Sequence, residues 1–244
     1  MRSVFFGGGT PEAERPPSNF VIPVLNAEEL RVLGCLLEKQ FLTPDVYPMT
    51  LNGIVTACNQ KTSREPVVAY DDVTALHTLD ALQAKGLTMK IVGGDNRVPK
   101  YRELLSEKTG LRVSELAVLC VMMLRGPQTV NELKDRTNRI HEFADVDEVE
   151  TVLERLAVRE PQRLVIRLPR LAGQKEPRSA HLLAGPVDLD DLQAHSIAAH
   201  APSGSPVRSL LEERLQRLET ENAELRERMA SLEAQFSEFR KQFE

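Results

Sequence analysis

The chain has 244 residues, of which 41% are hydrophobic and 27% charged, and its formal net charge is −5. This length fits one or two domains with tails. The acidic balance gives no overall electrostatic sign of a nucleic-acid partner, although a local basic patch is compatible with one. No stretch approaches the roughly 18 apolar residues that a membrane span requires, and Met1–Phe6 is too short for the core of a signal peptide.

The cysteines exclude the common metal sites. Cys35, Cys58 and Cys120 are widely spaced and odd in number. They form no metal-ligand pattern, so we expect no metal and no cofactor. Cys35 and Cys120 lie on the apolar faces of predicted helices, where a free cysteine is usually a buried thiol. Reduced thiols fit a cytoplasmic protein without a membrane partner.

The N-terminal half of the chain predicts an arm and a first domain. Residues 1–22 contain Gly7-Gly8-Gly9 and three prolines, which indicates a flexible arm. Residues 23–108 follow as a domain whose first helix opens with Asn26 and Glu29, spaced as in a capping box. The expected elements of this domain are helices at about 26–40, 50–59 and 71–85 and hairpin strands at 87–92 and 98–104.

Residues 109–185 predict a second domain that repeats the first. Leu25–Leu37 reads LNAEELRVLGCLL and Leu111–Leu124 reads LRVSELAVLCVMML, and both copies space apolar residues as on one face of an amphipathic helix. Three helices and a hairpin follow in the same order as before. The predicted fold class is therefore mainly α with small β-hairpins (α+β), with two tandem winged helix-turn-helix domains and a C-terminal coiled coil.

After a polar linker at 186–206, residues 207–244 keep a heptad pattern. With Leu218, Leu225 and Leu232 at d positions, Asn222 falls at an a position, which favours a parallel two-stranded coil. The flanking g and e charges are opposite in sign across such a pair. We therefore predict a parallel homodimer, the alternative being one helix packed on its own domain. The predicted dimer seam contains Leu211, Leu215, Leu218, Asn222, Leu225, Met229 and Leu232.

The predicted third helices carry acids instead of a positive reading face. In a winged helix the third helix usually enters the major groove, but here these helices contain Asp71, Asp72 and Asp80, and then five further acids between 145 and 154. Positive and polar side chains collect on the hairpins and two loops. The candidate contacts to nucleic acid or a partner are Asn59, Gln60, Lys61, Arg64, Arg97, Lys100, Arg102, Arg136, Arg139, Lys175 and Arg178.

Each candidate set has a competing structural interpretation. The hairpin cations could be ordinary solvated strand faces that pair with nearby acids. The loop Asn59–Pro66 could cap neighbouring helix ends, with Arg64 paired to Glu65 or Asp71. No nucleophile, base and orienting residue can be placed together, so we expect no enzymatic activity. His77 is expected to be a partly buried structural residue.

Several separated motifs resemble the YceH family of uncharacterised bacterial proteins. They are LLEK at 36–39, ACNQKTSREPV at 57–67, GDNRV at 94–98, LRGPQT at 124–129 and KEPRSAHL at 175–182. The resemblance covers about Leu25 to Leu183, and the trailing coiled coil is also similar. It implies a cytoplasmic, dimeric tandem winged-helix protein, and it implies no enzymatic activity.

Two functions of different class follow from the sequence. One is a DNA-binding, regulator-like homodimer that uses its hairpins and the Lys61–Arg64 loop. The other is a protein-protein adaptor whose acidic third helices bind an unidentified protein. Fold analogy favours the first function, although fold does not imply function, and the placement of charge favours the second.

Overall fold

The computed structural model describes residues 19–93, 96–170, 174–187, 217 and 220. By contacts, the chain separates between Val187 and Asp188 into two units. The second unit contains the predicted coiled coil, whose seam residues lie outside the described residues. Arg217 and Thr220, which are described, are helical and exposed.

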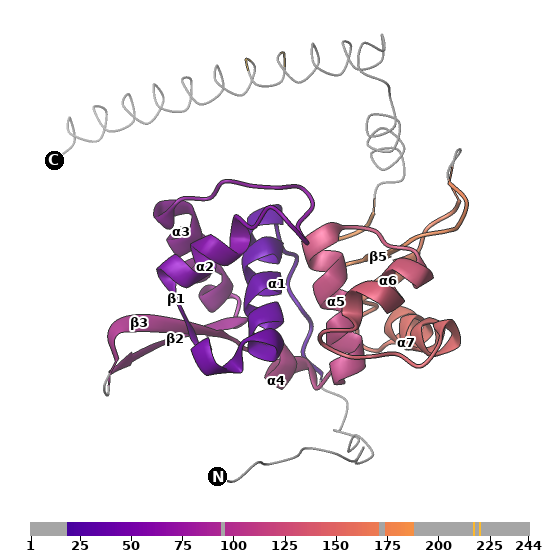
Figure 1. The fold of residues 1–244 in the computed structure, drawn as a ribbon, viewed down its shortest axis with the longest axis horizontal. Coiled ribbons are helices and arrows are strands. Elements are labelled where there is room, and N and C mark those ends of the chain that lie inside the picture. The colour runs from indigo at the N-terminus through magenta and orange to yellow at the C-terminus, as the bar shows by residue number, and fades with distance from the viewer. Residues whose placement is uncertain (1–18, 94–95, 171–173, 188–216, 218–219, 221–244) are drawn as a thin grey trace, which may run out of the picture. The chain divides into compact units, whose positions relative to one another are not determined.

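The first unit is mainly helical with small antiparallel sheets, as the predicted α+β class requires (Figure 1). Its elements fall into two series with the same order, joined by a short helix. The first series is α1 (Ala27–Leu42), η1 (Pro44–Val46), β1 (Met49–Thr50), α2 (Leu51–Cys58), α3 (Asp72–Ala84), β2 (Thr88–Gly93) and β3 (Asn96–Glu103). After α4 (Leu105–Thr109) come α5 (Val113–Arg125), α6 (Val130–Thr137), α7 (Val146–Val158), β4 (Val165–Arg167) and β5 (Ser179–His181).

The two halves start their helices with matching side chains. Thr50 and Thr129 cap α2 and α6, and Asp71 and Asp145 cap α3 and α7. Each cap accepts a backbone N–H that the first helical turn leaves without a partner. The predicted capping box at Asn26 is confirmed. Two of the acids at the starts of the third helices therefore have a local structural role.

The two halves also form similar small antiparallel sheets. In the first half, β1 pairs with β3, which pairs with β2, and all pairings are antiparallel. In the second half, β4 pairs with β5, and a single bridge from Gln128 to Ser179 occupies the place that β1 has in the first. The chain segment between the first and second helices thus reaches the returning hairpin strand in both halves.

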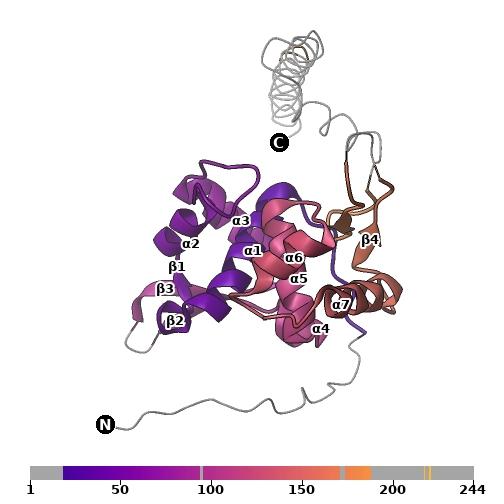
Figure 2. The ribbon, with the colours of Figure 1, turned by 45° about the vertical axis from the view of Figure 1, so that its right-hand side comes forward.

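The repeated helices α1 and α5 lie side by side at the centre of the unit (Figures 1 and 2). Every residue from Glu29 to Glu38 is buried in α1, and every residue from Ser114 to Leu124 is buried in α5. The sequence predicted one buried face on each helix. The prediction was incomplete because each helix packs on its own half and also on the other copy, which buries it all round.

Gly34 sets the closest approach between these helices. A Cβ atom at Gly34 would lie 3.0 Å from Cδ2 of Leu124 and 3.2 Å from Cβ of Met123. The Sγ atom of Cys120 donates a hydrogen bond to the Gly34 carbonyl oxygen at 3.5 Å. Since the missing side chain is what permits this contact, the α1–α5 packing depends on glycine at this position.

A second connection ties the start of the unit to its end. The Ile22 N–H donates to Oε1 of Gln162 at 2.7 Å, Nε2 of Gln162 donates back to the Ile22 carbonyl at 3.0 Å, and the Leu25 N–H donates to the Leu183 carbonyl at 2.8 Å. Ile22 is 1% exposed. Its assignment to a flexible arm was therefore wrong, because it belongs to the core that both halves share.

Two further expectations concern the burial of His77 and the presence of a membrane-spanning helix. His77 is exposed on α3, not partly buried as predicted, because the core side of α3 is formed by Ala75, Thr78, Leu79 and Leu82. Among the described residues, no helix has both the length and the hydropathy needed to cross a membrane.

Replacing Gly34 with alanine should destabilise the protein by about 1–2 kcal/mol. Crowding against Leu124 and Met123 should outweigh the better helix propensity of alanine. Gly53→Ala is the matched control, since its Cβ would meet nothing closer than 3.4 Å and should leave stability equal or slightly higher. Urea unfolding midpoints of both variants measure the effect. Equal stability of Gly34→Ala and wild type would contradict the assigned packing.

Candidate functional site

The loop Asn59–Pro66 crosses from the end of α2 to the C-terminal end of α5 (Figure 1). Asn59 closes its own end, because its Nδ2 donates to the Tyr70 carbonyl and its Oδ1 accepts from the Tyr70 N–H, both at 2.7 Å. At the other end, the Glu65 N–H donates to the Leu124 carbonyl at 2.8 Å. The Asn59 amide is thus used within the fold, although it bonds the Tyr70 backbone instead of capping a helix end.

Arg64 points inward from this loop. Its Nη1 and Nη2 atoms donate to the two carboxylate oxygens of Glu38 at 3.1 and 2.6 Å, and its Nε donates to the Ala57 carbonyl at 3.1 Å. The Arg64 side chain is 0% exposed. Burial alone would raise the pKa of Glu38, but the hydrogen bonds and charge of Arg64 outweigh it and lower this pKa. Arg64 was therefore wrongly predicted as a surface contact, and its partner is Glu38 rather than Glu65 or Asp71.

Arg31 of α1 holds both ends of the same loop. Its Nη1 donates to the Cys58 carbonyl at 3.2 Å and its Nη2 to the Pro66 carbonyl at 2.6 Å. Sequence reasoning missed this residue, although the repeat contained a signal. At the constant offset between the copies, Arg31 stands where the second copy has Ala117, and Glu38 stands where it has Leu124. Charged residues in only one copy of a buried helix mark these polar contacts.

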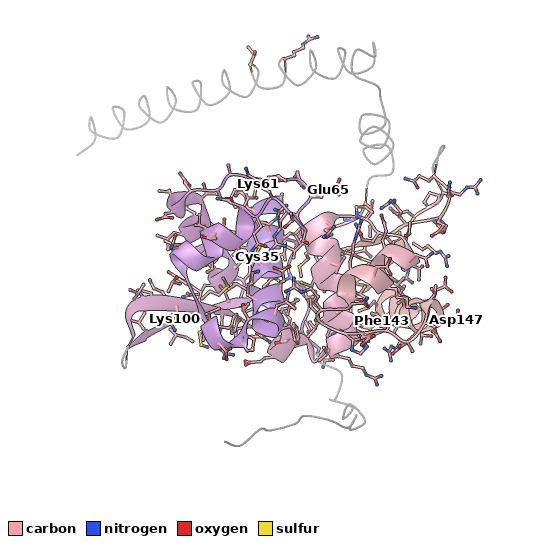
Figure 3. All side chains as sticks on the ribbon, in the orientation of Figure 1. Cys35, Lys61, Glu65, Lys100, Phe143 and Asp147 are labelled. Atoms are coloured by element: carbon pink, nitrogen blue, oxygen red, sulfur yellow. The ribbon has the colours of Figure 1, made fainter. Side chains whose placement is uncertain are left out.

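All three cysteines are free and buried, as predicted for Cys35 and Cys120. Figure 3 labels Cys35 near the centre of the unit. Burial would raise the pKa of Cys35, but a hydrogen bond with Cys58 and the nearby Arg64 charge lower it. Burial raises the pKa of Cys120. In the described part of the chain, no group of three or more histidine, cysteine or acidic side chains could hold a metal ion.

A second polar network lies where the loop meets the second half. Arg178 donates from Nη1 to the Pro127 carbonyl at 2.7 Å and to Oε2 of Glu132 at 2.8 Å. Nη2 of Arg136 lies 3.4 Å from the other oxygen of the same carboxylate, and Nη1 donates to Oε1 of Gln128. Arg125, which is not among the contacts predicted from the sequence, donates from Nη2 to the Ser63 hydroxyl at 2.7 Å. We call Arg125, Arg136 and Arg178 the junction arginines.

Positive charge is concentrated in this network. Partial burial lowers the pKa of Arg125, and the charges of Arg136 and Arg64 lower it further. Burial would raise the pKa of Glu132, but a backbone hydrogen bond from Thr129 and the charges of Arg178 and Arg136 lower it. The Glu132 carboxylate therefore pairs with two guanidinium groups, whereas the Arg125 side chain hydrogen-bonds only a neutral hydroxyl within the described residues.

The other predicted contacts are distributed over several surfaces. Lys61, Arg139 and Lys175 are exposed and Gln60 and Lys100 are half-buried, and none of the four cations forms an ion pair within the described residues. Arg102 pairs with Glu107, and the side chain of Arg97 lies outside the described part. In Figure 3, Lys61 lies on the loop along the upper edge and Lys100 on the first hairpin at the lower left.

The third helix of the second half presents acids to solvent. Asp147, Glu148 and Glu154 are exposed on α7, and Figure 3 places Asp147 at the right-hand edge of the unit. Glu150 lies 3.7 Å from Arg167 of β4. This helix therefore offers no positive face to a phosphate backbone, as its sequence predicted.

His181 is a largely buried imidazole at the base of the second hairpin. Its Nδ1 atom is buried and has no hydrogen-bond partner in the described structure. Burial lowers the pKa of His181 to about 4, from an ordinary value near 6.5. The neutral form is thus the one that the folded protein accommodates.

Arg64→Met should destabilise the protein by about 3–5 kcal/mol, because it leaves the buried Glu38 carboxylate without its main partner. The double variant Arg64→Met/Glu38→Met should regain much of that loss. Lys61→Met, three residues away and exposed, should change stability by less than about 0.5 kcal/mol. Denaturant unfolding measures all three. Similar small losses for Arg64→Met and Lys61→Met would contradict the assigned ion pair.

Stability should fall as the pH drops below about 6.5. Between that pH and about 4, the unfolded chain binds a proton at His181 and the folded chain does not, so acid favours unfolding. The expected loss from this group is about 2 kcal/mol between pH 7.5 and 5. His181→Gln should abolish that part of the pH dependence in urea titrations, whereas His77→Gln should keep it. An unchanged pH dependence in His181→Gln would rule out this role.

Related proteins match nearly the whole chain. Residues 25–174 match the family described as "Protein of unknown function, DUF480". A UPF0502 protein of Geobacter sulfurreducens is 47% identical over 222 residues, which cover 91% of this chain and 99% of the relative. The UPF0502 protein YceH of Salmonella newport is 44% identical over 218 residues, which cover 88% and 98%. As the resemblance of the motifs indicated, the chain belongs to the DUF480 family, whose curated relatives carry the name UPF0502.

Proposed function

We propose that this protein is a non-enzymatic, regulator-like DNA-binding protein. Its two halves would be tandem winged helix-turn-helix domains. The support is the repeated order of three helices and a hairpin, with β1 in one half and the Gln128–Ser179 bridge in the other completing each small sheet. In such domains, a helix and the hairpin wing are the elements that contact DNA.

The placement of the cations that form no ion pair within the described residues carries this proposal. Lys61, Arg139 and Lys175 are exposed on loops and on the hairpin turn, and Lys100 lies on β3. Contacts from such positions reach phosphates rather than base edges, and phosphate contacts position a protein without reading sequence. The expected binding is therefore salt-dependent and weakly selective, with the wings and loop as the contact surface instead of the acidic third helices.

The C-terminal heptads would double this surface. Asn222 at an a position and the complementary flanking charges favour a parallel homodimer, which would place two copies of each wing on one DNA molecule. Sedimentation at micromolar protein concentration should give a dimer. Asn222→Leu should raise the stability of the coil or alter its oligomeric state. A monomeric wild-type protein would refute the dimer.

The exposed acids of α7 favour a second candidate function. Asp147, Glu148 and Glu154 form no ion pair that would neutralise them within the described part, apart from the 3.8 Å contact of Glu148 with His141. A protein partner with a basic surface would suit this helix better than DNA would. An adaptor of this kind would need no nucleic-acid contact.

Fluorescence anisotropy with labelled genomic duplexes tests the DNA-binding function. The dimer should bind, and log K should fall linearly with log salt concentration. Lys100→Ala/Lys175→Ala should weaken binding at every sequence and make the salt dependence shallower. Lys108→Ala in α4, away from both wings, is the control and should bind as wild type does. Absence of binding at low salt would refute DNA binding and leave the adaptor function.

A further inference from the structure

The junction arginines form a site to which both halves contribute. Arg125 ends α5, Arg136 lies on α6, and Arg178 precedes β5, whereas Ser63 reaches Arg125 from the loop of the first half. The three arginines all belong to the second half, and the contact between Ser63 and Arg125 is made where α1 and α5 pack together and the Glu65 N–H bonds to the Leu124 carbonyl. Neither half alone contains the complete set.

The site contains more arginine side chains than carboxylates that contact them. Two guanidinium groups contact the Glu132 carboxylate, that of Arg178 at 2.8 Å and that of Arg136 at 3.4 Å, and the third arginine, Arg125, contacts the neutral Ser63 hydroxyl. The charges of Glu38 and Glu65 would raise the pKa of Arg125. They do not outweigh burial and the charges of Arg136 and Arg64, which lower this pKa. The side chains of Arg136 and Arg178 are 31% and 32% exposed. They are thus partly desolvated yet still accessible, which strengthens their attraction for an anion.

Hydrogen bonds with neighbouring residues fix the orientation of the guanidinium N–H donors of the junction arginines. Glu132 and Gln128 fix Arg136, and Glu132 and the Pro127 carbonyl fix Arg178. Within the described residues, the Arg125 side chain donates to the Ser63 hydroxyl alone, so most of its five N–H donors stay available. Ser63 has φ of 61°, in the left-handed region that costs a non-glycine residue energy. In this conformation its carbonyl binds Arg64 and its hydroxyl binds Arg125.

We propose that Arg125, together with Arg136 and Arg178, binds a phosphate of the DNA backbone at the junction of the two halves. This inference rests on the proposed DNA-binding function and adds a defined contact to it. A planar guanidinium with free donors matches two phosphate oxygens. A bound phosphodiester would also supply the negative charge that the three arginines lack. Lys61, exposed two residues before Ser63, extends the positive surface along the loop.

The test uses the full-length dimer and a labelled DNA duplex in anisotropy titrations at several salt concentrations. Arg125→Gln should weaken binding about tenfold and make the log–log salt slope shallower by about 1. Arg112→Gln, at the opposite end of α5, is the matched control and should leave affinity and slope unchanged. Ser63→Gly, which relieves the backbone but removes the hydroxyl, should lower affinity less than Arg125→Gln does. Thermal unfolding checks that each variant is folded.

The outcomes separate the junction site from the function on which it rests. If wild type binds DNA and Arg125→Gln matches Arg112→Gln in affinity and salt slope, the junction site is refuted and DNA binding stands. If wild type does not bind at low salt, both proposals fail. If Arg125→Gln is unfolded, Arg136→Gln replaces it, with the same expected loss and the same criterion for refutation.

Discussion

The close packing of α1 on α5 at Gly34 is the contact on which the rest of the unit depends. Each helix is the first helix of its half, and each supplies the central core element for the helices and hairpin that follow. By burying both helices all round, this contact joins the two halves into one body with a shared core. A small domain buries a limited fraction of its surface when it folds alone. Sharing the central helices increases that fraction for both halves.

The two copies have diverged most informatively inside this contact. Arg31 and Glu38 introduce charge into α1, whereas α5 keeps Ala117 and Leu124 at the corresponding positions. These two residues hold the loop of the first half across the end of α5. Buried ion pairs contribute little net stability compared with apolar packing, but an arrangement that leaves either charge unpaired is strongly disfavoured. The charges therefore select one loop conformation rather than adding much to its stability.

The sequence predicted the elements well and their surroundings less well. The repeat, the capping box at Asn26 and the hairpins follow from local patterns, and all are present. The partner of Arg64 could not be found in this way, because Arg64 lies in a loop and Glu38 lies 26 residues away on α1. Local reasoning offered only the neighbours Glu65 and Asp71. Likewise, Arg125 hydrogen-bonds Ser63, which lies 62 residues away in the sequence. No periodicity of the sequence encodes that contact.

The two hydrogen bonds between the Ile22 backbone and the Gln162 side chain have a consequence for folding during translation. These residues are separated by 140 positions, and the partner of the Leu25 N–H, the Leu183 carbonyl, lies close to the end of the unit. A chain emerging from the ribosome at about 5–20 residues per second exposes residues 22–25 long before their partners exist. The first half can form its own helices early, but its leading segment must wait for the second hairpin. Completion of the unit is therefore coupled to the translation of its last residues, and a chain that stops before Leu183 keeps that apolar segment unprotected.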